Sequence, residues 1–232
     1  MKRLTLALAL FCTARPSLAA FCNYFSTGPV ANGTFIRTAN ATLVIPPHSP
    51  KTGLLSLWTG MGTSNGDLIQ ALVESYNGSA DTGCGVLPKQ DWCAYSSTLS
   101  VNGKKQGQIG ARQVLVKPGD HVQQSYIYND ADGLYDQYTL VNGRLTSTLR
   151  TRSGHAQGWG TAEECQPEEP CGPVPAHHWI DVVLVFDSAD PSYGATVGTN
   201  GASGNLVTKD GGVVWTAAEI HINACDFNFT AS

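Results

Sequence analysis

Hydrophobic and polar residues alternate in short runs along most of the chain, and Gly, Asn, Asp and Pro separate the runs. Alternation with a period of two is typical of a β-strand that buries one face. The runs predict strands within 52–61, 67–76, 92–101, 112–130, 133–154, 177–189 and 213–227. The fourth run is two strands around a turn at Lys117–Asp120. The fifth is a hairpin centred on Asn142 and Gly143, because Asn-Gly is the strongest short hairpin signal.

Helical periodicity is nearly absent. Residues 67–76 could form a short helix by propensity, but the neighbouring runs favour a strand. Strands at this spacing without intervening helices predict an all-β fold, a two-sheet antiparallel β-sandwich or jelly roll. Residues 177–189 are apolar on both faces in the middle, so this strand is expected to lie inside its sheet.

Residues 1–19 have the pattern of a secretion signal. Lys2 and Arg3 precede a short apolar run, and small residues at Ser17 and Ala19 predict cleavage after Ala19. No later segment has the roughly 20 apolar residues of a membrane helix. We therefore expect a secreted, soluble, monomeric protein in which 20–232 form one domain.

Composition narrows the range of partners. Charged residues make up 14% of the chain and the formal net charge is -4, so the chain lacks the basic stripe of a nucleic-acid-binding protein. Abundant Gly, Ser, Thr and Asn suit an extracellular β protein. Residues 129–133 faintly resemble a calcium loop but lack its later Glu, which favours a β-turn. No cofactor or metal is expected.

Cysteine usage agrees with export. Six cysteines follow the signal, and an even number in a secreted chain favours three disulfides among fifteen possible pairings. We favour Cys84–Cys93 and Cys165–Cys171, since each pair brackets a turn-rich loop, and this leaves Cys22–Cys225. The glycosylation sequons are at Asn32, Asn40, Asn77 and Asn228.

Alternation within 67–76 divides the side chains between two faces. Ile69, Ala71 and Val73 share a face that suits the core, so Gln70 and Glu74 share the other. A solvated strand face would explain these two polar residues, but a mixture of Gln, Glu, Leu and Tyr also suits a groove that grips a polymer.

Further polar groups follow the same rule. Glu219 and His221 are two residues apart and share a face, and His178 precedes an apolar strand. Tyr126 and Tyr128 share a face, where they either contact a ligand or pack against the sheet. Together with Trp58 and Arg112, these residues are the remaining candidates for a binding or catalytic site.

The stretch LWTGMGTSNGDLIQALVE resembles a strand–loop–strand of the fungal glutamic peptidases, the eqolisins. The resemblance covers roughly 54–186 and implies a concanavalin-like sandwich. It implies that Gln70 helps to position a water and stabilise an oxyanion. The family's catalytic Glu, in an A-E-W-I motif, falls on His178 if Trp-Ile is matched and on Glu163 if Ala-Glu is matched.

The sandwich also resembles secreted polysaccharide lyases and glucanases. A lyase requires an amide or Arg beside the uronate and a Tyr or His for proton transfer, whereas a glucanase requires two carboxylates. Our leading interpretation is a polysaccharide lyase or glycoside hydrolase. Gln70 polarises the substrate, Tyr126 or His178 moves protons, and Glu74 or Glu219 is a second acid or base. Trp58, Arg112, Tyr128 and His221 bind substrate. The alternatives are a non-catalytic glycan-binding protein and a divergent glutamic-type peptidase that uses Gln70 with Glu163 or a His.

Overall fold

The computed structural model describes residues 19–31, 33–47, 53–76, 83–88, 91–102, 105–166 and 170–227. These residues form strands and loops, with no α-helix and one 3-10 turn, η2 (Tyr193–Thr196). No helix among them is long and apolar enough to cross a membrane. Residues 1–18 of the predicted signal and the sequon residues Asn32, Asn77 and Asn228 lie outside the described residues, whereas Asn40 is half-buried in a strand.

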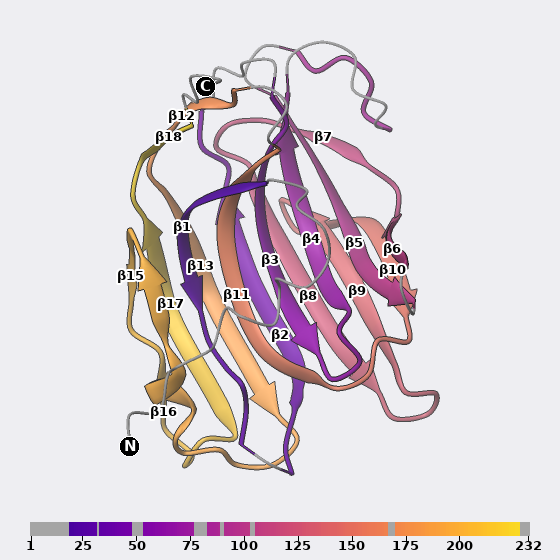
Figure 1. Ribbon diagram of the computed structural model, residues 1–232, viewed down its shortest axis with the longest axis vertical. Coiled ribbons are helices and arrows are strands. Elements are labelled where there is room, and N and C mark those ends of the chain that lie inside the picture. The colour runs from indigo at the N-terminus through magenta and orange to yellow at the C-terminus, as the bar shows by residue number, and fades with distance from the viewer. Residues whose placement is uncertain are drawn as a thin grey trace.

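One layer of the fold, the front sheet, has the strand order β14-β1-β11-β3-β4-β5, with β6 and β7 both paired to β5 (Figure 1). Its strands are β1 (Ala20–Ser26), β3 (Leu55–Thr63), β4 (Leu68–Ser75), β5 (Trp92–Asn102), β6 (Lys105–Gly110), β7 (Val114–Val116), β11 (Ala156–Cys165) and β14 (Gly198–Asn200).

The second layer, the back sheet, has the order β10-β9-β8-β2-β13-β17, and β15 and β16 pair with β17. Its strands are β2 (Ile36–Val44), β8 (His121–Asn129), β9 (Leu134–Val141), β10 (Arg144–Thr151), β13 (His177–Phe186), β15 (Ala202–Gly204), β16 (Val207–Thr208) and β17 (Val214–Ile222). A separate two-stranded sheet pairs β12 (Gly172–Val174) with β18 (Cys225–Phe227).

The two sheets enclose a single main core. Leu57 and Ile69 of the front sheet and Leu43 and Trp179 of the back sheet belong to the same buried cluster. Every pairing between the described strands is antiparallel, and the sheets are joined by one bridge between Ala156 and Ile36. The predicted all-β antiparallel sandwich is therefore confirmed.

Two turns form where the sequence places them. Asn142 and Gly143 both have positive φ, 50° and 79°, as a two-residue type I′ hairpin requires. In the turn before β8, Gly119 has φ 89° and the N–H of Asp120 donates to the carbonyl of Lys117 at 2.9 Å. This is a type II pattern with Pro118 and Gly119 at its centre.

The three disulfides have the predicted pairing: Cys22–Cys225, Cys84–Cys93 and Cys165–Cys171. Cys22–Cys225 fixes β1 to β18 across a separation of 203 residues. Cross-links of this density are typical of proteins that fold in an oxidising compartment.

Several strands were missed. β1 and β2 precede the first predicted run, β11 lies between the runs 133–154 and 177–189, and β6 lies between the runs 92–101 and 112–130. Glu163, Glu164 and Cys165 are the last residues of β11. These strands take part in extensive pairing, since β2 lies between β8 and β13, and β11 between β1 and β3.

Candidate functional site: the outer face of the front sheet

Strand β4 presents Gln70 and Glu74 on the face that points away from the core. Ile69, Ala71 and Val73 join the buried cluster between the sheets, as predicted. Gln70 and Glu74 are themselves only 5% exposed. They are four residues apart on one strand, which separates their backbones by about 13 Å. The two groups therefore share a face but do not form a directly paired amide and carboxyl.

Strand register places a second carboxyl level with Glu74. Ser56 on β3 is opposite both Glu74 on β4 and Glu164 on β11. Residues that are opposite across neighbouring strands share a face, so both carboxyls lie on the outer face, two strand spacings or about 10 Å apart at the backbone. Glu164 is half-buried and thus more accessible than Glu74.

The environment of Glu74 favours its neutral form. Burial raises the pKa of its carboxyl from 4.5 to about 7, and the charge of Glu164 acts in the same direction. The hydroxyl of Tyr95 on β5 donates a hydrogen bond to Glu74 Oε1 at 3.0 Å, and this bond and one from Ser56 partly oppose the pKa rise. Glu74 can therefore hold a proton at mildly acidic pH.

Glu164 also has a pKa above its ordinary value, because the partial burial of its carboxyl disfavours the charged form. The side-chain amide of Gln166 donates to Glu164 Oε1 at 3.1 Å and favours the charged form. The two carboxyls thus have different surroundings, a condition that can give one of them the role of acid and the other that of base.

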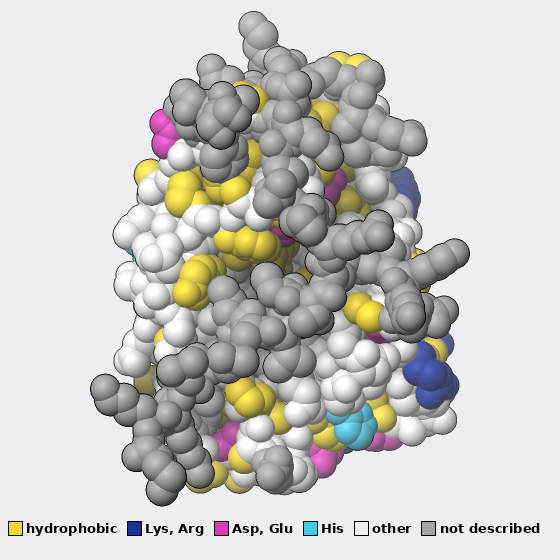
Figure 2. Space-filling view, viewed as in Figure 1, with side chains coloured by type: hydrophobic (Ala, Val, Ile, Leu, Met, Phe, Trp, Pro, Cys, Tyr) yellow, Lys and Arg dark blue, Asp and Glu magenta, His cyan; other side chains and the backbone are white. Residues whose placement is uncertain are grey.

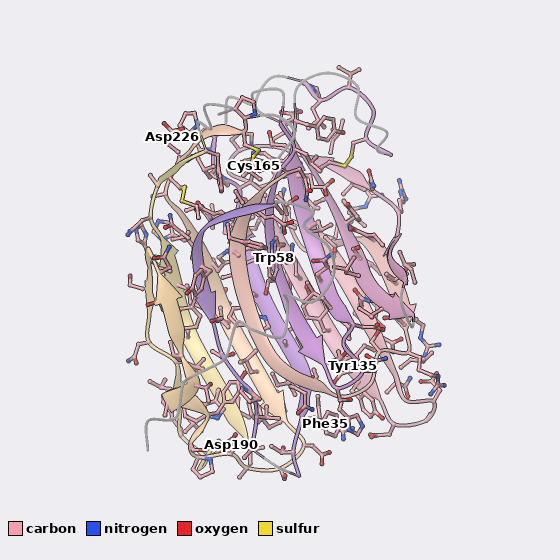
Figure 3. All side chains as sticks on the ribbon, in the orientation of Figure 1. Phe35, Trp58, Tyr135, Cys165, Asp190 and Asp226 are labelled. Carbon is pink, nitrogen blue, oxygen red and sulfur yellow. A yellow bond between two sulfur atoms is a disulfide. The ribbon has the colours of Figure 1, made fainter. Side chains whose placement is uncertain are left out.

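Aromatic side chains lie beside the two carboxyls. Trp58 is the next outward-facing residue after Ser56 on β3 and lies near the centre of this face (Figure 3). Phe21 on β1, opposite Glu164, is 55% exposed and meets the Trp58 ring edge-on, with centroids 6.5 Å apart. Figure 2 shows hydrophobic side chains, with acidic groups among them, over the middle of this face. The face combines flat apolar area with proton-transfer groups.

Gly60 allows the close approach of β3 and β4 beside Gln70. Gly60 is opposite Gln70 in the register. A Cβ at this position would lie 2.7 Å from the carbonyl oxygen of Ile69 and 3.1 Å from the Cβ of Gln70. A side chain is therefore excluded here, and the residue of β3 directly opposite Gln70 offers only backbone.

Glu163, one of the two predicted general bases, points into the sandwich. The N–H of Asn23 donates to Glu163 Oε2 at 3.2 Å, and His177 Nδ1 lies 3.7 Å from Oε1. Burial raises the pKa of Glu163 to about 8 and lowers that of His177 to about 4, so both are mainly neutral near pH 7. The prediction is corrected: Glu163 faces the core, whereas Gln70 faces outward from the same sheet. Alternation along β11 directs Glu164, not Glu163, to the outer face.

Tyr126 also belongs to the interior. It is 1% exposed, and its hydroxyl donates to the carbonyl of Thr59 at 2.7 Å, which links β8 to β3 across the core. The predicted role of Tyr126 in proton transfer is corrected to a structural one, because its hydroxyl is sealed between the sheets.

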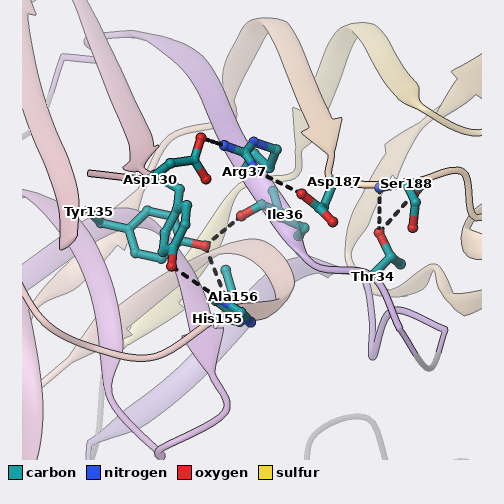
Figure 4. Close-up of polar contacts among 10 residues, drawn as sticks. Thr34, Ile36, Arg37, Asp130, Tyr135, His155, Ala156, Asp187 and Ser188 are labelled. Carbon is teal, nitrogen blue, oxygen red and sulfur yellow. Dashed lines mark hydrogen bonds and ion pairs between the residues drawn. The ribbon is translucent and has the colours of Figure 1, made fainter. Parts of the chain in front are cut away.

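Tyr128 lies at one end of the sandwich rather than beside Gln70. Its hydroxyl is 3.2 Å from His155 Nε2, and the His155 ring stacks on Phe35 with centroids 3.9 Å apart. Arg37 covers Phe35 and Tyr128 and is paired with two Asp side chains, in the neighbourhood shown in Figure 4. Tyr128 is therefore part of a packed aromatic cluster.

Arg112 is exposed and lines a surface hollow with Leu115, Arg144 and Thr146. His178, Glu219 and His221 lie together on the outer face of the back sheet. The predicted single site that contains all these groups is thus not formed. Of its members, the front sheet brings together Gln70, Glu74 and Trp58.

Sequence reasoning missed three members of the face, namely Ser56, Tyr95 and Glu164. The signal was available for Tyr95, because Trp92 and Ala94 are core residues and alternation places Tyr95 outward. Glu164 could have been separated from Glu163 by the same rule only if 156–165 had been recognised as a strand.

No protein-family model matches the sequence, and no curated protein matches it significantly. Solved structures do match. Scytalido-glutamic peptidase with a peptide-based transition state analog superposes with a TM-score of 0.51 at 12% identity, over 86% of this chain and 99% of that chain. The same peptidase with a transition state analog inhibitor gives 0.51 at 13% identity, over 87% and 98%.

A third match is SCP-B, a member of the Eqolisin family of peptidases in complex with the tripeptide Ala-Ile-His. It has a TM-score of 0.48 at 13% identity and covers 87% of this chain and 98% of that chain. At such identities the likeness to the glutamic peptidase shows the fold alone. The chain therefore has a distant eqolisin-like, concanavalin-like β-sandwich fold, as the sequence resemblance implied.

Proposed function

We propose that the protein is a secreted hydrolase that cleaves glycosidic bonds in a polysaccharide on the outer face of its front sheet. The observation that carries the proposal is the carboxyl pair Glu74 and Glu164, which the strand register places level on one face, with burial raising the pKa of Glu74 to about 7. Glycoside hydrolysis uses such a pair, one carboxyl as an acid and the other as a base or nucleophile.

Glu74 is the general acid in this scheme. Its proton passes to the glycosidic oxygen as the bond to the leaving sugar breaks, and Tyr95 stabilises the carboxylate that remains. Glu164, partly exposed, takes a proton from the attacking water.

Trp58 and Phe21 bind the sugars on either side of the cleaved bond. Sugar rings have apolar faces, and a half-exposed Trp with an exposed Phe beside it offers flat apolar area for them. Gln70, about 13 Å along β4, is close enough to contact a more distant sugar unit. The three disulfides support action outside the cytosol.

The test is release of reducing ends from a panel of polysaccharides, followed in parallel with ultraviolet absorbance that detects unsaturated lyase products. Glu74→Gln and Glu164→Gln each lower the rate by about 100-fold or more, whereas Glu219→Gln on the other sheet leaves it unchanged. The absence of reducing-end release from all substrates, or full activity in both Gln variants, would refute the proposal. Unsaturated products would indicate a lyase instead.

The fold likeness to a glutamic peptidase supports peptide cleavage as the second candidate. It is less favoured because Glu163 faces the interior and His178 belongs to the back sheet. Neither of the two predicted bases therefore lies on the same face as Gln70. Cleavage of denatured protein at acid pH, lost in Gln70→Ala and retained in Glu219→Gln, would establish it. Glycan binding without cleavage of either substrate would leave a non-catalytic binding protein.

A further inference from the structure

Three metal-ligating side chains converge on the outer face of the back sheet, on strands β13 and β17. His178 is directly opposite His221 in the register, and Glu219 precedes His221 by two residues on the same strand. Residues two apart on a strand share a face, and so do residues opposite each other across a strand pair. The antiparallel register therefore dictates this cluster.

The side chains already lie near a geometry that can hold a metal ion. His178 Nδ1 is 2.8 Å from Glu219 Oε1, and the His178 and His221 rings are 4.8 Å apart between centroids. One ligand atom from each residue lies within 4.8 Å of the others. Tetrahedral zinc bonds of about 2.0–2.1 Å place ligand atoms roughly 3.3 Å apart, which lies between these limits. Small side-chain rotations bring all three to one ion.

The surroundings allow an ion to enter. The side chains of His178 and Glu219 are 45% and 55% exposed, so they can turn without disturbing the core. The residues that flank the pair of histidines in the same cross-strand row are Val44 on β2 and Ser203 on β15, both uncharged. A divalent cation therefore meets no opposing charge from these two neighbours, and a fourth ligand position faces solvent.

We propose that His178, Glu219 and His221 bind one Zn²⁺ ion, with solvent as the fourth ligand. Two imidazoles and a carboxylate suit zinc better than calcium, which prefers oxygen ligands. The ion links β13 to β17. The site is on the opposite sheet from Glu74 and Glu164, so it is independent of the proposed hydrolase chemistry.

The test is a zinc titration of the purified protein after removal of metals, by calorimetry and by competition with a chromophoric chelator. We expect one Zn²⁺ per chain, and no calcium binding that depends on these residues. Glu219→Gln weakens zinc binding by about 10-fold or more, and the double change His178→Ala with His221→Ala abolishes it. Co²⁺ bound in place of zinc gives the strong visible absorption of a tetrahedral site, which the double variant lacks.

His121→Ala is the matched control. His121 is an exposed histidine on β8, opposite Val44 and therefore in the same row of the sheet, but one strand further from the cluster. This variant binds zinc as the unchanged protein does. Near-ultraviolet circular dichroism confirms that each variant is folded. Zinc binding that survives in the folded double variant, or the absence of stoichiometric binding in the unchanged protein, would overturn the proposal.

Discussion

Glu74→Gln tests the buried carboxyl of the front sheet without requiring a known substrate. The folded protein raises the pKa of Glu74 from 4.5 to about 7, mainly because the side chain is buried. The folded state therefore holds its proton more tightly than the unfolded chain. It follows that stability contributed by neutral Glu74 is fully present below pH 4.5 and is lost as the pH rises through about 7.

The size of this loss follows from the two pKa values. A change from 4.5 to about 7 corresponds to about 3 kcal/mol in the free energy of unfolding, at about 1.4 kcal/mol per pKa unit. Glutamine has nearly the same shape and no proton to lose. Relative to the Gln variant, the unchanged protein should thus lose about 3 kcal/mol of stability between pH 4 and pH 8.

The assay is urea denaturation at several pH values with the disulfides intact, in which the free energy of unfolding is compared between the two proteins. Asp181→Asn is the control, since Asp181 is exposed and has a φ of 55° that Asn also adopts. This variant should track the unchanged protein at every pH. Parallel pH profiles for Glu74→Gln and the unchanged protein would refute the reasoning, because they would mean that Glu74 ionises alike in the folded and unfolded states.

Three further changes test neighbouring features. Tyr95→Phe removes a hydrogen bond to the Glu74 carboxylate, so the pKa of Glu74, read from the pH dependence of unfolding, should rise by about one unit. Tyr126→Phe leaves a buried carbonyl of β3 without its donor and should cost about 1–2 kcal/mol in urea denaturation, with unchanged catalysis. Gly60→Ala places a Cβ 2.7 Å from a backbone oxygen of β4, and should lower the denaturation midpoint by an amount equivalent to about 1–3 kcal/mol.

Local rules predicted the features that depend on neighbours in sequence. Asn142-Gly143 fixed a two-residue turn, because both residues reach positive φ readily. Alternation correctly predicted that Val73 faces the core and Glu74 faces outward, since the side chains of successive strand residues point to opposite faces. The disulfides followed from short separations for two pairs and from the remaining two cysteines for the third.

Strand β11 shows why other parts of the fold were not predicted. Gly158 and Gly160 weaken its strand pattern, because glycine has a low β propensity. These glycines are explained by packing: a Cβ at Gly160 would lie 3.0 Å from the carbonyl of Phe25 on β1. The close approach of β1 and β11 joins residues that are more than 130 positions apart in the sequence. A local sequence pattern cannot predict such a contact.

The composition of the candidate site depends on register more than on residue type. Alternation predicts whether a side chain faces the core or the outside. A sandwich has two outer faces, however, and only the pairing of strands determines on which of them a strand lies. β13 pairs with β2 and β17, which carries His178 to the back sheet, whereas β11 pairs with β3 and β1. A slip of one residue in β11 would exchange Glu163 and Glu164 between core and surface. The carboxyl that is level with Glu74 is therefore selected by the pairing of Ser56 with Glu164, a long-range contact that the sequence pattern alone does not contain.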